Sequence, residues 1–128
     1  MNAKSENLIA QNIDTWIAAH REEIVDALSR LVSIRSVSVR DEEGPYPFGR
    51  GCAQALDCAL SMARELGMST RNLDYYCGTA TGLGDGKSGS IGIIAHLDIV
   101  PEGSGWSFPP FDAQQVDGFL VGRGTDDD

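Results

Sequence analysis

The feature that most constrains the fold is a short, almost wholly apolar run from Ile91 to Pro101. Its β-branched residues, with Gly and Ser before them and Pro at the end, predict a β-strand that is buried on both faces. Side chains two positions apart on a strand point to the same face, so His96 and Asp98 are expected side by side near its carboxyl end. In α/β folds that end of a strand is where ligands bind.

A His and an Asp placed in this way suit a metal centre. A neutral imidazole is a good ligand for transition metals, and a nearby carboxylate can fix its tautomer and raise its basicity. His96 is therefore a candidate metal ligand, and Asp98 is the candidate residue that orients it. The His-x-Asp pattern alone is not specific, because a structural hydrogen-bonded pair is the commoner explanation.

The residues downstream make the pattern specific. The order H-x-D-x-V-P-x-G-x-G-W-x-x-x-P-F begins at His96 and is followed by G-R-G-x-x-D-D, which runs from Gly122 to Asp128. This order resembles the dinuclear-zinc amidohydrolases, which include aminoacylases, acetylornithine deacetylases, succinyl-diaminopimelate desuccinylases, glutamate carboxypeptidases and carnosinase-like dipeptidases. Residues 31–37 and 72–76 also resemble the corresponding segments of the bacterial dipeptidase branch, although less closely than the motif from His96 to Asp128 does.

The resemblance implies a fold and an activity. It implies an α/β chain, the N-terminal part of a zinc-exopeptidase-like α/β/α catalytic domain with a mixed sheet, and no second domain within residues 1–128. The implied activity is metal-dependent hydrolysis of an amide bond in a dipeptide or an N-acyl amino acid. Two zinc ions would hold and acidify a water and polarise the amide carbonyl, and cobalt or manganese would suit the same ligands.

The resemblance also assigns roles within the chain. It makes His96 a terminal metal ligand, Asp127 the carboxylate that bridges the two ions, and Asp98 the orienting residue. The general-base glutamate and the remaining ligands of the family pattern have no counterpart here. A catalytic zinc site typically takes three protein ligands. The chain alone is therefore expected to be inactive, as a piece of a longer metallopeptidase.

Two other interpretations stay open. The chain could be a non-catalytic truncated product that binds metal weakly or self-associates through an exposed sheet edge. It could also be a metal-free α/β binding domain in which His96 and Asp98 form a structural pair.

The composition limits the classes of partner and the cellular location to expect. A net charge of −9 disfavours nucleic acid and anionic membrane surfaces. No segment is apolar and long enough to cross a bilayer, and the first residues lack a secretion signal. Three cysteines without C-x-x-C spacing suggest reduced thiols, so a cytoplasmic location is expected. A homodimer is compatible with these features.

Local patterns predict the remaining elements. Apolar residues at helical spacing predict one helix, or two in tandem meeting near His20, over residues 8–32, with Trp16 as a core anchor. A further helix is expected over 50–66, ended by Gly67. Strands are expected over 69–77 and 79–83, and they are expected to pair with a turn at Gly78 or nearby. A second hairpin is expected over 111–121, with its turn at Asp117-Gly118. The loop 102–110 either lines a ligand cleft or is pinned to the core by Trp106 and Phe111.

Overall fold

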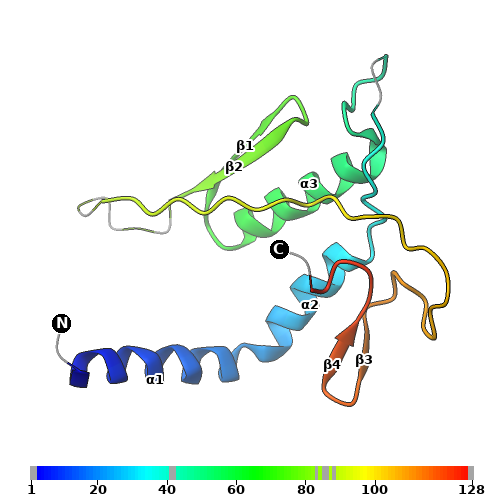
Figure 1. Ribbon diagram of the computed structural model, residues 1–128. Coiled ribbons are helices and arrows are strands. Elements are labelled where there is room, and N and C mark those ends of the chain that lie inside the picture. The colour runs from blue at the N-terminus through cyan, green and yellow to red at the C-terminus, as the bar shows by residue number, and fades with distance from the viewer. Residues whose placement is uncertain (1–2, 41–42, 83, 85–86, 88, 127–128) are drawn as a thin grey trace.

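The computed structural model describes residues 3–40, 43–82, 84, 87 and 89–126 (Figure 1). Within these residues the elements follow the order α1 (Ala3–Ala19), α2 (Arg21–Val32), α3 (Gly49–Glu65), β1 (Ser69–Leu73), β2 (Cys77–Thr81), β3 (Gln114–Val116) and β4 (Phe119–Val121). The predicted α/β class is confirmed. None of the helices in the described ranges combines the length and the apolar character that a membrane span requires.

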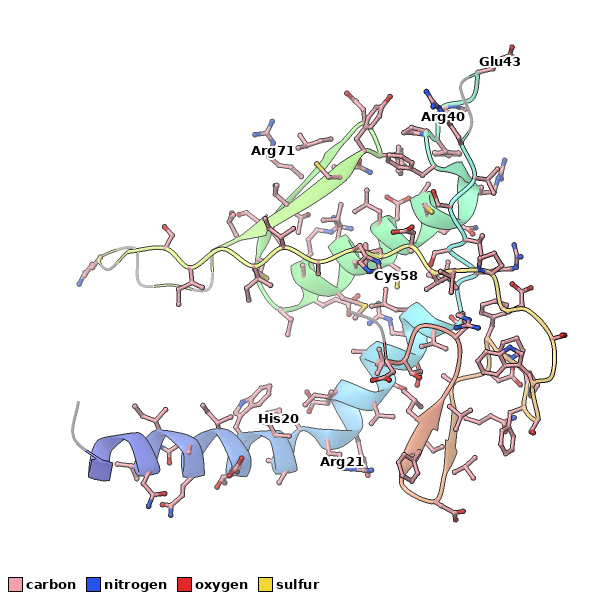
Figure 2. The ribbon with its side chains drawn as sticks, in the orientation of Figure 1. His20, Arg21, Arg40, Glu43, Cys58 and Arg71 are labelled. Carbon is pink, nitrogen blue, oxygen red and sulfur yellow. The ribbon has the colours of Figure 1, made fainter. Side chains whose placement is uncertain are left out.

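The N-terminal segment forms two helices in tandem that meet at His20, which is one of the two arrangements predicted. The His20 ring stacks on Trp16 with 4.2 Å between centroids, and its Nδ1 lies 2.8 Å from the Trp16 carbonyl oxygen. Figure 2 shows His20 at this junction, with Arg21 beginning α2. The prediction that Trp16 anchors a core is wrong, because 56% of the residue is exposed. The reason is that α1 extends away from the other described elements (Figure 1).

The core lies where α3 meets α2 and the β1–β2 hairpin. Its buried apolar residues are Val32 of α2 and Ala53, Ala55 and Leu60 of α3. The helix ends as predicted at Gly67, whose φ of +83° is one that glycine adopts without strain. There the Gly67 N–H donates to the Arg64 carbonyl and the Met68 N–H to the Ala63 carbonyl, which is the Schellman motif.

Both strand pairs are antiparallel hairpins. The β3–β4 hairpin turns at Asp117-Gly118, as predicted, with positive φ at both residues. In the first hairpin the turn lies at Asp74-Tyr75, earlier than the predicted position near Gly78. Gly78 is within β2 instead, and a Cβ there would lie 2.8 Å from Leu56 Cδ1 of α3. The glycine thus serves close packing of the hairpin on the helix.

The prediction that residues 91–100 form a strand buried on both faces is wrong. The segment is extended, yet Ile91, Ile93 and Ile94 are 91%, 90% and 98% exposed. Its one pairing among the described residues is a parallel bridge between Ile99 and Val37. The physical reason is that a buried strand needs neighbours on both edges and layers on both faces, and the described residues place none there. The described strand ladders are the two antiparallel hairpins, and the expected mixed sheet is not formed among the described residues, where this bridge is the one parallel pairing.

Candidate active site

His96 and Asp98 lie against each other at the end of the extended segment. The imidazole Nδ1 is 2.9 Å from the Asp98 backbone oxygen and 3.4 Å from the carboxylate Oδ1. A backbone oxygen can only accept, so Nδ1 carries the proton, and Nε2 is the nitrogen with the lone pair when the imidazole is neutral. The two side chains are 48% and 53% exposed. The pair has the geometry of a ligand imidazole whose second nitrogen is fixed by its own chain.

Ser36 holds this end of the segment in place. It is 3% exposed, and its hydroxyl donates to the Leu97 carbonyl at 2.7 Å. The Ile99 N–H in turn donates to the Ser36 carbonyl at 3.2 Å. Because these two bonds flank Asp98, Ser36 fixes the backbone that carries the His–Asp pair. Sequence reasoning missed this role, although Ser36 belongs to the 31–37 segment that carries part of the resemblance.

The N-terminal part of α3 supports Ser36 from behind. A Cβ on Gly51 would lie 2.2 Å from the Arg35 carbonyl oxygen, so only glycine lets the helix approach this closely. The neighbouring Cys52 thiol donates to the Ser36 carbonyl at 3.3 Å. Burial, and then the charge of Asp98, raises the pKa of the Cys52 thiol above its ordinary value. That thiol is therefore less ionised than an ordinary cysteine at neutral pH.

The Gly-Arg-Gly segment reaches the same place from the other end of the chain. A Cβ on Gly124 would lie 2.8 Å from Ile99 Cγ2, and one on Gly122 would lie 2.5 Å from Val32 Cγ1. Arg123 and Gly124 line a hollow of about 90 Å³ together with His96 and Asp98. The structure thus brings the described part of the G-R-G-x-x-D-D motif beside the His–Asp pair. Asp127, the predicted bridging carboxylate, lies outside the described residues.

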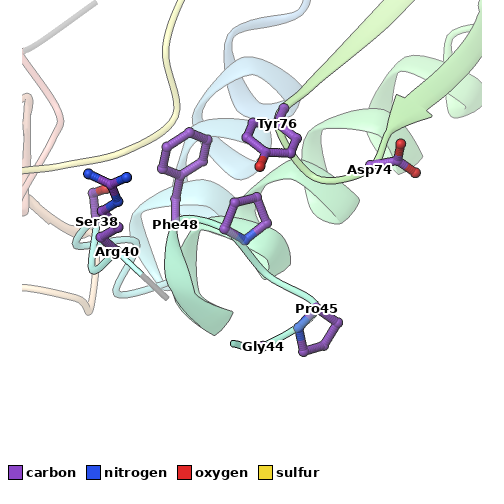
Figure 3. Close-up of a pocket in the computed structure, with 8 residues that line it drawn as sticks. Ser38, Arg40, Gly44, Pro45, Phe48, Asp74 and Tyr76 are labelled. Carbon is purple, nitrogen blue, oxygen red and sulfur yellow. The ribbon is translucent and has the colours of Figure 1, made fainter. Parts of the chain in front are cut away.

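Two larger hollows lie near the pair. His96 and Asp98 also line a hollow of about 340 Å³, whose wall includes Ser38, Phe48, Cys52 and Tyr76. Ser38, Phe48 and Tyr76 in turn line an adjoining hollow of about 730 Å³. Figure 3 shows Phe48 and Tyr76 in that hollow between Arg40 on one side and Asp74 on the other. The Phe48 and Tyr76 rings meet edge to face at 5.7 Å between centroids.

The loop after the pair is pinned to the body of the chain. The Trp106 indole N–H donates to the Glu102 carbonyl at 2.6 Å, and the Arg123 guanidinium lies 5.1 Å from the centre of the Trp106 ring. Of the two interpretations of this loop, pinning by Trp106 is the one that these contacts support.

The described residues do not by themselves complete a metal site. They hold no group of three or more His, Cys, Asp or Glu side chains that could bind one ion. His96 fits the chemistry of a single ligand, while a catalytic zinc typically takes three from protein. All three cysteines are free thiols. The described residues therefore hold one oriented imidazole and the groups that support it.

The fold and the site together define an α/β chain with an oriented imidazole beside a Gly-Arg-Gly segment. Comparison with known proteins shows which family has similar sequences. Residues 92–128 match the model of peptidase family M20/M25/M40. The chain is 36% identical over 116 residues to a protein of Staphylococcus haemolyticus named as a putative dipeptidase, covering 88% of the chain and 24% of that protein. It is 35% identical over 120 residues to the Beta-Ala-Xaa dipeptidase of Lactobacillus delbrueckii subsp. lactis, covering 91% and 25%.

A protein of Bacillus subtilis, also named as a putative dipeptidase, is 33% identical over 118 residues, covering 91% of the chain and 25% of that protein. The chain is thus related in sequence to peptidases of family M20/M25/M40, and the predicted resemblance is confirmed. It spans about a quarter of the length of the curated relatives that it matches.

Proposed function

We propose that this chain supplies part of the active site of a metal-dependent peptidase that hydrolyses the amide bond of dipeptides or N-acyl amino acids. In this proposal His96 is a terminal ligand of a dinuclear zinc centre, Asp98 orients it, and Asp127 bridges the two ions. The observation that carries the proposal is the contact of His96 Nδ1 with Asp98, at a hollow that Gly124 also lines. The relatives named as dipeptidases support the reaction class and the small peptide substrate.

The residues of this chain would divide the work. Zinc, when bound, lowers the pKa of a coordinated water and polarises the scissile carbonyl. Asp98 keeps the His96 proton on Nδ1, so that Nε2 is the nitrogen that would bind the metal. The adjoining hollows beside His96, walled by Phe48 and Tyr76, offer apolar surface on which the substrate side chain can pack.

The remaining ligands and the general base are proposed to come from polypeptide that this chain does not include. Two observations support this part of the proposal. The chain spans about a quarter of the length of its relatives, and the described residues hold an incomplete set of metal ligands. We accordingly expect the chain alone to bind zinc weakly and to show no turnover. A cytoplasmic location fits three free thiols and belongs to the same proposal.

The test compares the two histidines of the sequence. Zinc affinity is measured by competition with a chromophoric chelator for the wild-type chain, His96→Ala and His20→Ala. We expect His96→Ala to lose binding and His20→Ala to keep it, because His20 is stacked on Trp16 in the N-terminal helices. Asp98→Asn keeps the backbone oxygen that accepts from Nδ1 and removes only the carboxylate charge at 3.4 Å, so it should weaken binding less than His96→Ala does. Equal affinities for the wild type and His96→Ala would refute the metal site.

A dipeptidase assay with added zinc tests the expectation that the chain alone shows no turnover. Sustained turnover by the wild-type chain that disappears in His96→Ala would show that the chain is catalytically complete and that the proposed division of the site is wrong.

A competing proposal is a non-catalytic module that self-associates. The exposed apolar segment around Ile93 and Ile94 favours it, because an unpaired extended edge is a template for strand pairing. Light scattering over a range of concentrations separates the two. Association that Ile93→Lys abolishes, without zinc affinity in the wild type, would support the module.

A further inference from the structure

Glu102 is the point where three segments of the chain are joined. Its carboxylate receives the Arg35 guanidinium, with Nε to Oε1 at 3.0 Å and Nη2 to Oε2 at 3.0 Å. Its backbone oxygen accepts from Trp106 Nε1 at 2.6 Å and from Arg123 Nη2 at 3.1 Å. The loop after α2, the loop after the His–Asp pair and the Gly-Arg-Gly segment therefore converge on one residue.

Arg123, in the third of these segments, contacts several residues of the other segments. Its N–H donates to the Pro110 carbonyl at 2.7 Å, and its guanidinium both covers the Trp106 ring and donates to Glu102. Its Nε is buried without a hydrogen-bond partner in the described part of the chain. A buried donor of this kind is costly and calls for an explanation.

Arg123 lies beside the His–Asp pair. It lines the hollow of about 90 Å³ with His96 and Asp98, and the next residue, Gly124, packs on Ile99. The contacts of its guanidinium all reach the loop that directly follows the His–Asp pair. The side chain thus ties the start of the acidic motif to the segment that carries the imidazole.

We infer that Arg123 is a positioning residue of the site: its guanidinium holds the loop that directly follows the His–Asp pair, and so fixes where the His96 ring lies. This inference rests on the proposed function, because the ring to be positioned is the proposed metal ligand. Lysine cannot replace the arginine, since one ammonium cannot cover an indole ring and also present a planar fork to the Glu102 carbonyl. Side chains that lose these contacts should let the loop after the pair, and with it the His96 ring, change position.

The experiment uses the 128-residue chain with Arg123→Lys, Arg123→Gln and a matched control, Arg30→Gln. Arg30 is also a guanidinium in a two-bond contact, at 2.8 and 3.0 Å from Glu65, but its partner lies at the far end of α3. One readout is the position of the His96 ring resonances in the metal-free chain at a single pH. The other is zinc affinity.

We expect both Arg123 variants to shift the His96 resonances and to weaken zinc binding at least tenfold, the usual effect of losing a supporting residue. Arg30→Gln should do neither. Glu102→Gln should have the smaller effect, because it removes the Arg35 ion pair and leaves the backbone oxygen that Arg123 uses.

The outcomes separate the two proposals. Folded Arg123 variants with unchanged His96 resonances would overturn the positioning role, whatever zinc does. A wild-type chain without zinc affinity would refute the proposed metal site, while shifted resonances would still support the positioning role. If both Arg123 variants fail to fold by circular dichroism, Trp106→Phe replaces them: it removes the indole donor to Glu102, and unchanged His96 resonances in that variant would also overturn the inference.

Discussion

Replacing Ser36 with alanine tests whether one buried hydroxyl fixes the His–Asp pair. The hydroxyl donates to the Leu97 carbonyl at 2.7 Å from a residue that is 3% exposed. Ser36→Ala leaves that carbonyl without its donor, which costs about 1–3 kcal/mol. Since 1.4 kcal/mol is a factor of ten, local opening of this attachment should become roughly 5- to 150-fold more frequent.

Amide hydrogen exchange of Ile99 measures that opening, because its N–H donates to the Ser36 carbonyl. Ser29→Ala is the matched control, since its hydroxyl makes an equally short 2.7 Å bond, to the Val25 carbonyl within α2. A bond of that local type adds little to stability, so its loss should leave the Ile99 exchange rate unchanged. Equal exchange rates in the two variants would refute the claim that Ser36 anchors the site.

Two further predictions follow from the shifted pKa values. The Arg35 hydrogen bond lowers the Glu102 carboxyl pKa below its ordinary 4.5, so the stability from this pair is present above pH 4.5 and is lost as the pH falls through the lowered value. Urea unfolding followed from neutral to acidic pH should show this loss in the wild type and not in Glu102→Gln, and identical pH profiles would contradict it. Burial and the Asp98 charge raise the Cys52 thiol pKa, so iodoacetamide should modify Cys52 more slowly than the exposed Cys77. Asp98→Asn should accelerate Cys52 modification, and a rate that does not change would show that the charge plays no part.

The elements that the sequence predicted are those set by local chemistry. Gly67 ends α3 because a positive φ is needed there, and Asp117-Gly118 turns the second hairpin for the same reason. Each of these signals is contained within a few residues, so tertiary context had no part in it.

The elements that the sequence did not predict depend on remote segments. The roles of Ser36, Glu102 and Arg123 come from polar contacts across 61, 67 and 21 positions, and no spacing rule encodes such contacts. For Arg123 and Glu102 the available signal was that both lie inside the recognised motif. The exposure of Trp16 was missed for a related reason, because an apolar stripe predicts burial and does not name the surface that buries it.

The exposed segment before His96 is part of an unusually large exposed surface, and this explains why the strand prediction failed. A compact protein of 13.7 kDa should expose about 6,600 Å² of surface, whereas this chain exposes 9,711 Å². The excess, on the order of 3,000 Å², is comparable to the area buried in an obligate protein interface. Much of the large apolar surface lies on α1 and on residues 91–94, which flank the body formed by α2, α3 and the first hairpin. The apolar run therefore keeps the composition of a buried strand while lacking the neighbours that would bury it. Under the proposed function, the polypeptide that supplies the remaining ligands would also be the natural cover for this apolar surface beside His96.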